Sequence, residues 1–273
     1  MNRLDMARRA RVVAALVEGN SLRATARLTG VARMTIEKLL RDLGSACETF
    51  HGKTVRNLKT KRVQADEIWA FCYAKARNVT PEIREQHPDA GDVWTWTAID
   101  AESKLMISWL VGKRDVPTAS FFMRDVASRL ANRVQLTTDG LSIYMHAVDA
   151  GFSGDVDWAV LNKVYKGGQD GRFSPPKLSH TMRATMTGRP DAGHVSTSYV
   201  ERSNLTMRMH MRRFTRLTNG FSKKAEMHAH SVALHFTYYN FCKVHQTLRV
   251  TPAMEAGISD HVWSLEELVS LLD

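Results

Sequence analysis

The spacing of hydrophobic residues changes near residue 61. Before this point apolar residues recur every three or four positions, a spacing that predicts amphipathic helices. After it, short apolar runs rich in aromatic and β-branched residues alternate with helical segments, as is typical of an α/β protein. We therefore predict an α/β fold in which a small all-α region precedes a mixed sheet flanked by helices.

The second region contains five candidate strands. They are expected at residues 63–71, 93–100, 105–112, 134–138 and 157–165. A tight turn joins the second to the third, so the first three are expected to pair antiparallel. Helices are expected at 118–132 and 141–151, and a long helix begins near Ser198. This order of elements is the ribonuclease-H-like arrangement. The Gly-, Pro- and Ser-rich residues 166–197 are expected to form a long loop.

Two adjacent acids, Asp66 and Glu67, lie inside the first candidate strand. Burying a carboxylate costs free energy unless it is paired or binds a metal. Because neighbouring side chains of a strand point to opposite faces of the sheet, the two acids are not expected to serve one site. We expect Asp66 to face a cleft and Glu67 to lie on the other face with a basic partner. Asp139 follows the fourth strand at a Gly turn, a position where loops carry function.

A third acid, Glu201, has two interpretations that the residues leave open. Ser198 and Glu201 have the spacing of a capping box, in which Glu201 only stabilises the start of a helix. On that helix Arg208 and Arg212 would lie within about 20° of Glu201 around the axis. A carboxylate followed by two basic residues on one stripe instead suits a metal site beside a phosphate backbone.

Residues 21–44 carry the pattern of a helix-turn-helix. A small residue, Ala26, comes four positions before Gly30, and the aliphatic Ile36 follows six positions later. The second helix is expected over 32–42. Its exposed face would present to a DNA major groove the side chains of Arg33, Thr35 and Lys38. A plain helical hairpin is the alternative, because local motif matches have false positives.

Basic residues gather in three blocks. Residues 1–64 hold 14 Lys/Arg against 5 Asp/Glu, whereas the whole chain has a net charge of +10. Residues 202–224 carry seven Lys/Arg and no acid, and residues 163–190 carry six against Asp170 alone. Solvated faces are the alternative for any one block. Three blocks together predict a polyanionic partner, most simply double-stranded DNA.

Composition narrows the setting and the domain plan. Three cysteines, far apart and odd in number, make no disulfide framework and no zinc-finger spacing. No apolar run has the length of a membrane span and no secretory h-region is present, so we expect a cytoplasmic protein without a membrane partner. The expected parts are a helix-turn-helix domain at 1–46, a basic linker at 47–61, a catalytic domain at 62–245 and a C-terminal helical tail at 246–273.

Several of these stretches occur in order in one known group of proteins. The segments QADEIW, TTDG and YVERSNLTMRMHMRRF, followed by YYNFCKVHQTLRVTPAMEAG, resemble the DDE transposases of bacterial insertion sequences, and among them the IS-one family. The resemblance runs from about Arg62 to Leu272. It implies a ribonuclease-H-like core, DNA strand cleavage and transfer into target DNA. It also implies that the catalytic and metal-ligating residues are Asp66, Asp139 and Glu201.

The resemblance implies cofactors and partners as well. Mg²⁺, with Mn²⁺ as a substitute, is the expected cofactor. Double-stranded DNA, at the element ends and in the target, is the expected partner, bound by a homo-oligomer. Many relatives begin with a cysteine-rich zinc ribbon, but those cysteines are missing here, so no zinc is expected. Contacts to the DNA backbone are expected from Arg202, Arg208, Arg212 and Arg213.

Two other functions fit part of the pattern. A helix-turn-helix transcriptional regulator would explain the first basic block but not acids on three separate elements. Another ribonuclease-H-like nuclease or integrase would use the same acids. Strand transfer by the purified protein separates a transposase from a simple nuclease, which yields cut ends and no joined product.

Overall fold

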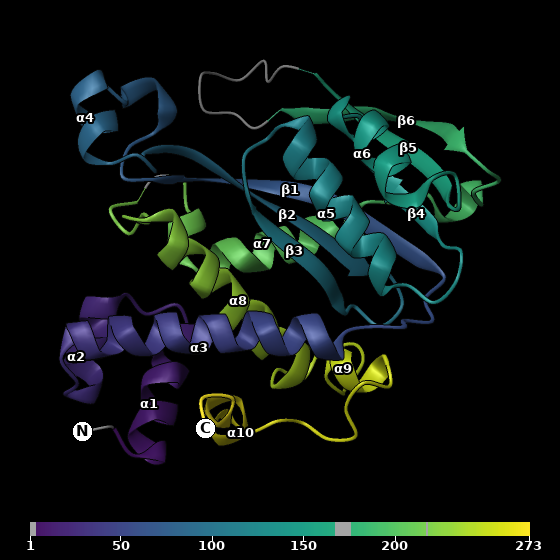
Figure 1. The fold of residues 1–273 in the computed structure, drawn as a ribbon. Helices are drawn as coiled ribbons and strands as arrows, with labels where there is room; N and C mark the ends of the chain where they lie inside the picture. Colours follow the sequence, from purple (N-terminus) through teal and green to yellow (C-terminus); the bar gives the residue numbers. More distant parts are fainter. Residues whose placement is uncertain (1–3, 167–175, 217) are drawn as a thin grey trace.

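The computed structural model describes residues 4–166, 176–216 and 218–273. Within these residues a six-stranded sheet carries helices on both faces (Figure 1). The strands are β1 (Arg62–Cys72), β2 (Gly91–Asp100), β3 (Met106–Gly112), β4 (Gln135–Thr138), β5 (Asp157–Lys166) and β6 (Lys177–Thr187). Their order across the sheet is β3-β2-β1-β4-β5-β6.

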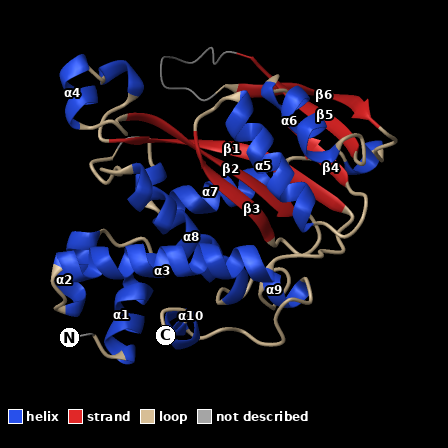
Figure 2. Cartoon of the chain, viewed as in Figure 1, coloured by secondary structure: helices blue, strands red, loops and turns tan. Residues whose placement is uncertain are grey.

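Strand direction divides the sheet into two parts. β1, β2 and β3 pair antiparallel, as the tight turn predicts. β4 pairs parallel with both β1 and β5. Because parallel neighbours need a long crossover, a helix precedes each of β4 and β5. These helices are α5 (Val116–Arg129) and α6 (Ile143–Phe152). The predicted mixed α/β sheet flanked by helices is confirmed, as Figure 2 also shows.

β6 corrects one prediction. The sequence predicts a loop over residues 166–197, but β6 lies within this stretch and pairs antiparallel with β5. Residues 167–175 lie outside the described part of the chain. Every residue of β6 except Thr187 is exposed. The strand therefore escapes prediction because no buried face imposes an alternation of apolar and polar residues.

A hydrophobic core lies on each face of the sheet. On one face Trp96 of β2 is buried with Phe122 of α5. The helices on the other face are α7 (Ser198–His210) and α8 (Ala225–Phe241). There Ile68 of β1 is buried with Val200 of α7 and Phe236 of α8. Each such side chain stabilises the fold by about 1.5–3 kcal/mol, so α7 is held firmly against the strand that carries Asp66.

Three helices precede the sheet. They are α1 (Met6–Val17), α2 (Leu22–Thr29) and α3 (Arg33–Thr54). α3 extends beyond the predicted 32–42, so residues 47–54 of the predicted linker are helical. It continues because Leu43 and Cys47 are buried in a core shared with α8. Gly44 permits this packing, since a Cβ there would lie 2.5 Å from the Cβ of His230.

The end of the chain returns to the N-terminal helices (Figure 1). Leu268 of the last helix is buried with Val12 of α1, and Arg9 forms an ion pair with Asp273. The remaining short elements are α4 (Pro81–Gln86), α9 (Pro252–Glu255), α10 (Leu265–Ser270), η1 (Ala76–Asn78), η2 (Ala192–His194) and η3 (Arg212–Phe214). Across the described residues, every helix is too short or too polar to cross a membrane.

Candidate active site

Asp66 lies in the middle of β1, opposite Thr97 of β2, and its side chain faces α7. Asn204 of α7 donates from Nδ2 to Asp66 Oδ2 at 2.8 Å. Thr97 Oγ1 donates to the main-chain carbonyl oxygen of Asp66 at 3.1 Å. Among the described residues no cationic side chain forms an ion pair with Asp66. Its carboxylate is therefore positioned by a neutral amide.

The surroundings of Asp66 disfavour its charged form. Burial, followed by the charges of Glu67 and Asp139, raises the pKa of Asp66 from 3.8 to about 7. A cation held beside the carboxylate would reverse this effect, because an opposite charge favours the ionised form. The electrostatics of this position thus favour binding of a cation.

Glu67 lies on the opposite face of β1 and has a basic partner, as predicted. Arg114 donates from Nη2 to Glu67 Oε1 at 2.7 Å, and the hydroxyl of Tyr144 on α6 donates to Oε2 at 3.1 Å. The side chain of Glu67 is only 2% exposed. Burial and the charge of Asp139 raise its pKa, whereas Arg114 lowers it. Both carboxylate oxygens of Glu67 are already engaged by protein donors.

Asp139 follows β4 directly, at the predicted Gly turn. Its Oδ1 accepts a hydrogen bond from the backbone N–H of Leu141 at 3.0 Å, an Asx-turn that fixes the side chain. Gly140 is required by a close approach, because a Cβ there would lie 1.7 Å from Oδ1 of Asn162 on β5. The turn therefore holds Asp139 at the end of β4, next to β1.

One carboxylate oxygen from each of Asp66, Glu67 and Asp139 lies within 4.8 Å of the other two. The prediction that Asp66 and Glu67 do not serve one site stays a prediction, because both Glu67 oxygens are engaged by Arg114 and Tyr144. Asp66 and Glu67 do point to opposite faces of β1, but β4 is its parallel neighbour and ends at Thr138, so Asp139 is reached from both faces. Glu67 is engaged by Arg114 and Tyr144, which leaves the carboxylates of Asp66 and Asp139 as candidate ligands of a hard divalent cation such as Mg²⁺, which prefers oxygen ligands.

Glu201 lies in the first turn of α7, outside this group of acids. Lys163 of β5 donates to both of its carboxylate oxygens, and Thr197 Oγ1 donates to Oε1 at 2.6 Å. α7 begins at Ser198, as predicted, but its N-cap residue is Thr197 and no side chain caps its amides in capping-box fashion. The capping-box interpretation of Glu201 is therefore wrong, and its carboxylate is instead engaged by Lys163.

Two polar side chains that the sequence alone did not single out connect α7 to β1. One is Asn204, and the other is Gln64, which is almost fully buried. Gln64 Oε1 accepts from the backbone N–H groups of Tyr199 at 2.8 Å and Val200 at 3.2 Å, so it satisfies donors at the start of the helix. Gln64 precedes Asp66 by two residues and shares its face of the strand. This period of two is the signal that could have identified it.

Arg202 and Arg208 occupy different environments on α7. Arg202 is exposed. Arg208 is half-buried, and its Nε has no hydrogen-bond partner among the described residues. Burial lowers the pKa of Arg208 and the charge of Asp66 opposes that change, so the guanidinium lies within electrostatic reach of the candidate site.

Arg212 and Arg213 do not extend this helix. The sequence predicts Arg212 on one helical stripe with Glu201. This prediction is wrong, because α7 ends at His210 and Arg212 lies in η3. Arg212 is exposed, whereas the guanidinium of Arg213 donates to Ser222 Oγ and to a main-chain carbonyl at the start of α8. Burial lowers the pKa of Arg213 to about 10. Arg213 thus packs inside the protein, and Arg212 faces solvent.

The residues predicted to face a DNA groove are exposed at the start of α3. They are Arg33, Thr35 and Lys38. Lys38 pairs with Asp42 one turn later. Gly30 ends α2 with a φ of 68°, a left-handed conformation that suits glycine, and α3 starts three residues later. All three side chains are available to a partner.

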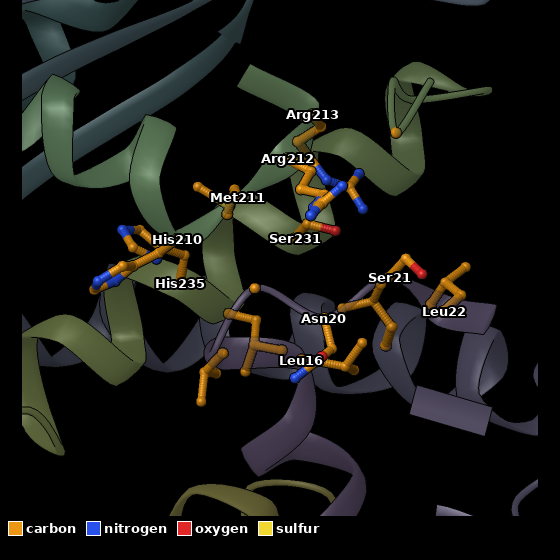
Figure 3. A pocket seen from close by; sticks show the side chains of 15 residues that line it. Leu16, Asn20, Ser21, Leu22, His210, Met211, Arg212, Arg213, Ser231 and His235 are labelled. Carbon is orange, nitrogen blue, oxygen red and sulfur yellow. The ribbon is translucent and has the colours of Figure 1, made fainter. Parts of the chain in front are cut away.

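A separate pocket lies between the turn that joins α1 to α2 and the start of η3 (Figure 3). None of the acids described above lines it. Gly19 is one of the residues that line it, and a Cβ there would come within 2.7 Å of the carbonyl oxygen of His210. Figure 3 shows Arg212 and Arg213 above Ser231 on the opposite wall. The pocket marks a close junction between the N-terminal helices and the rest of the protein.

No protein-family model matches this sequence, and no curated protein matches it. Solved structures that resemble it include a piggyBac transposase synaptic complex with hairpin DNA, with a TM-score of 0.43 and 9% identity, over 98% of this chain and 69% of that chain. A pre-cleavage Mos1 transpososome has a TM-score of 0.23 and 12% identity, over 59% of each chain. Because these values are low, the interpretation of the site depends on its own geometry.

Proposed function

We propose that this chain is a DNA transposase of the DDE type that acts through Asp66, Asp139 and Glu201. The observation that carries the proposal is the approach of Asp66 and Asp139, which come from adjacent parallel strands and meet within 4.8 Å. The strand order β3-β2-β1-β4-β5 agrees with a ribonuclease-H-like core. A transcriptional regulator has no need for acids that meet in this way.

Mg²⁺, with Mn²⁺ as a substitute, is the proposed cofactor. Asp66 and Asp139 would hold it, joined by Glu201 when that carboxylate leaves Lys163. When bound, a pair of such ions activates the attacking oxygen and stabilises the leaving oxygen of a phosphodiester. Support comes from the pKa of Asp66, which is raised to about 7 where no cation is paired with it. Asp66 must lose its proton to act as a ligand.

The surrounding residues would orient the acids and the DNA. Asn204 fixes the Asp66 carboxylate, and Gln64 fixes the start of α7, so Glu201 stays beside β5. Arg208 lies within electrostatic reach of Asp66 and has an unpartnered Nε in the described structure, so it would hold a DNA phosphate near the acids. Arg202 is exposed on the same helix and would position the backbone further out.

The N-terminal helices would recognise the ends of the element. Arg33, Thr35 and Lys38 are exposed at the start of α3, where a recognition helix presents its side chains to a major groove. In this proposal the protein binds both ends of a bacterial insertion sequence as a homo-oligomer on double-stranded DNA. It cuts at those ends and joins the freed 3′-hydroxyl to target DNA.

Strand transfer by the purified protein tests the proposal. The substrate is a duplex containing the inverted repeat that flanks the gene, with Mg²⁺ and a supercoiled target. We expect the wild type to yield a joined product, and Asp139→Asn to fold and bind the duplex without joining it. Glu201→Gln should behave in the same way, because an amide cannot supply the charge of a ligand. Joining by Asp139→Asn at the wild-type rate would refute the site. Cut ends without joined product would favour the nuclease alternative.

A further inference from the structure

β6 is exposed on both faces and forms an edge of the sheet. All residues from 177 to 186 are exposed, although they form a regular strand paired with β5. The hairpin also carries exposed large apolar side chains. These are Tyr165, Leu178, Met182 and Met186. An uncovered edge with apolar side chains is a site for association, and natural proteins cover such edges or protect them with charge.

The hairpin is basic on both faces. Residues that pair directly across antiparallel strands share a face. Arg183 pairs with Leu161, on the face that carries Lys163. Lys166 pairs with Lys177, on the opposite face. Lys163 is paired with Glu201 of α7, but the described residues 158–166 and 176–190 contain no acid, and Lys166, Lys177 and Arg183 form no ion pair with the described residues. The exposed strands therefore present positive charge in two directions.

We infer that the β5–β6 hairpin is a ribbon that lies in a groove of duplex DNA and carries the DNA toward the candidate active site. This inference rests on the proposed function and assigns its DNA partner to a particular element. A major groove about 12 Å wide admits a two-stranded ribbon, and its two phosphate backbones flank the ribbon on both sides. Basic side chains on both faces complement this arrangement. A second copy of the chain on the same edge would bring like charges together, which opposes pairing.

The root of the hairpin connects to the acids. Lys163 donates to Glu201, so a DNA phosphate that draws Lys163 away would release that carboxylate. Asn162, the preceding residue, lies against Gly140 in the turn that holds Asp139. In Figure 1 the hairpin extends along the edge of the sheet far from α1–α3. The ribbon would therefore contact DNA separately from the N-terminal helices. The DNA bound along the ribbon would reach the candidate active site.

Binding measurements on the full-length protein test this ribbon. The variant combines Lys166→Ala, Lys177→Ala and Arg183→Ala. None of these three side chains makes a hydrogen bond or ion pair with another described residue, so the fold should be unaffected. The matched control removes the same charge from exposed positions outside the basic blocks, at Arg77, Lys113 and Arg249. Affinity for a random-sequence duplex is measured by fluorescence anisotropy over a series of salt concentrations.

We expect the ribbon variant to lose about ten- to a hundredfold in affinity, and the slope of log K against log salt to fall by about two to three. The control should lose much less. Equal affinity and slope for wild type and ribbon variant would overturn the inference. So would a change of oligomeric state at unchanged DNA affinity, which would assign the edge to a second copy of the chain. Both readouts are independent of catalysis, so an inactive wild type would refute the proposed function without affecting this test.

Discussion

The two faces of β1 treat neighbouring carboxylates differently. On the α6 face, Glu67 is paired with Arg114 and Tyr144, so its charge is compensated within the protein. On the α7 face, Asp66 accepts from the neutral amide of Asn204 and has no ion-pair partner in the described part of the chain, and its pKa is raised to about 7. Asp66 is half-buried, and a carboxylate withdrawn from water without a cationic partner lowers stability, whereas a paired one such as Glu67 can be structural. The difference indicates a structural role for Glu67 and, in the proposed function, leaves Asp66 as the metal ligand.

The largest expected effect separates the two acids by activity. Asp66→Asn should lower the single-turnover rate of strand transfer about a thousandfold or more, because several kcal/mol of metal-assisted stabilisation are lost. Glu67→Gln should retain transfer within about tenfold, since the amide oxygen can still accept from Arg114 and the amide nitrogen can donate to the hydroxyl oxygen of Tyr144. If Asp66→Asn and Glu67→Gln were equally inactive, the two acids would not have different roles, and Glu67 would be a further metal ligand.

A second prediction concerns the pH dependence of the metal-free protein. Because the pKa of Asp66 is raised from 3.8 to about 7, the folded state keeps a proton that the unfolded state releases. The free energy of unfolding should therefore fall between about pH 4 and pH 7, by about 2–4 kcal/mol from this group. Urea unfolding in EDTA, compared between wild type and Asp66→Asn at each pH, isolates the contribution. Parallel curves for the two proteins would contradict it.

A third prediction concerns the ion pair between Glu67 and Arg114 on the α6 face of β1. Arg114→Met leaves Glu67 buried without an ion-pair partner and should lower the free energy of unfolding by about 1–3 kcal/mol. The expected loss could be as small as about 1 kcal/mol because the Arg114 side chain is 37% exposed, so solvent screens part of its attraction to Glu67. Adding Glu67→Gln should recover most of the loss. Chemical denaturation of the single and double variants provides the measurement, and the absence of any recovery would show that the pair is not coupled.

The smallest expected effect concerns Lys163. Lys163→Met removes the cation that holds Glu201, so Mn²⁺ should bind about two- to fivefold more tightly, as expected for a partly exposed ion pair. Calorimetric titration of the DNA-free protein measures this affinity without using activity. Lys166→Met is the control, because it lies three residues along the same strand, on the opposite face, and forms no ion pair with the described residues. Weaker or unchanged Mn²⁺ binding by Lys163→Met would show that the two cations do not compete.

The parts of the fold that could be predicted from sequence are those with a buried face. β1 to β5 follow runs of apolar residues, and the alternation along β1 places Asp66 and Glu67 on opposite faces as observed. β6 has no buried face and therefore no pattern. The sequence predicts too short a helix for α3, because residues 47–54 are mostly polar. In the structure Cys47 and His51 continue the buried face of this helix.

For the candidate site, sequence identifies residues but not their partners. The positions of Asp66 and Asp139 follow from the bounds of β1 and β4. Local patterns of apolar residues determine these bounds. The contact between Lys163 and Glu201 depends on how β5 and α7 lie in space, and no local pattern encodes that distance. Gln64 belongs to the same class, because its two backbone partners lie on α7, far along the chain.

The packing of Gly44 against His230 limits how this protein can be re-engineered or exchanged between relatives. α3 presents Arg33 and Lys38 at one end and packs on α8 along the rest of its length. A graft that joins new N-terminal helices at residue 46 would divide a continuous helix and separate its packing face from α8. Exchange of the N-terminal helices should therefore preserve the fold only when α8 is exchanged together with α3.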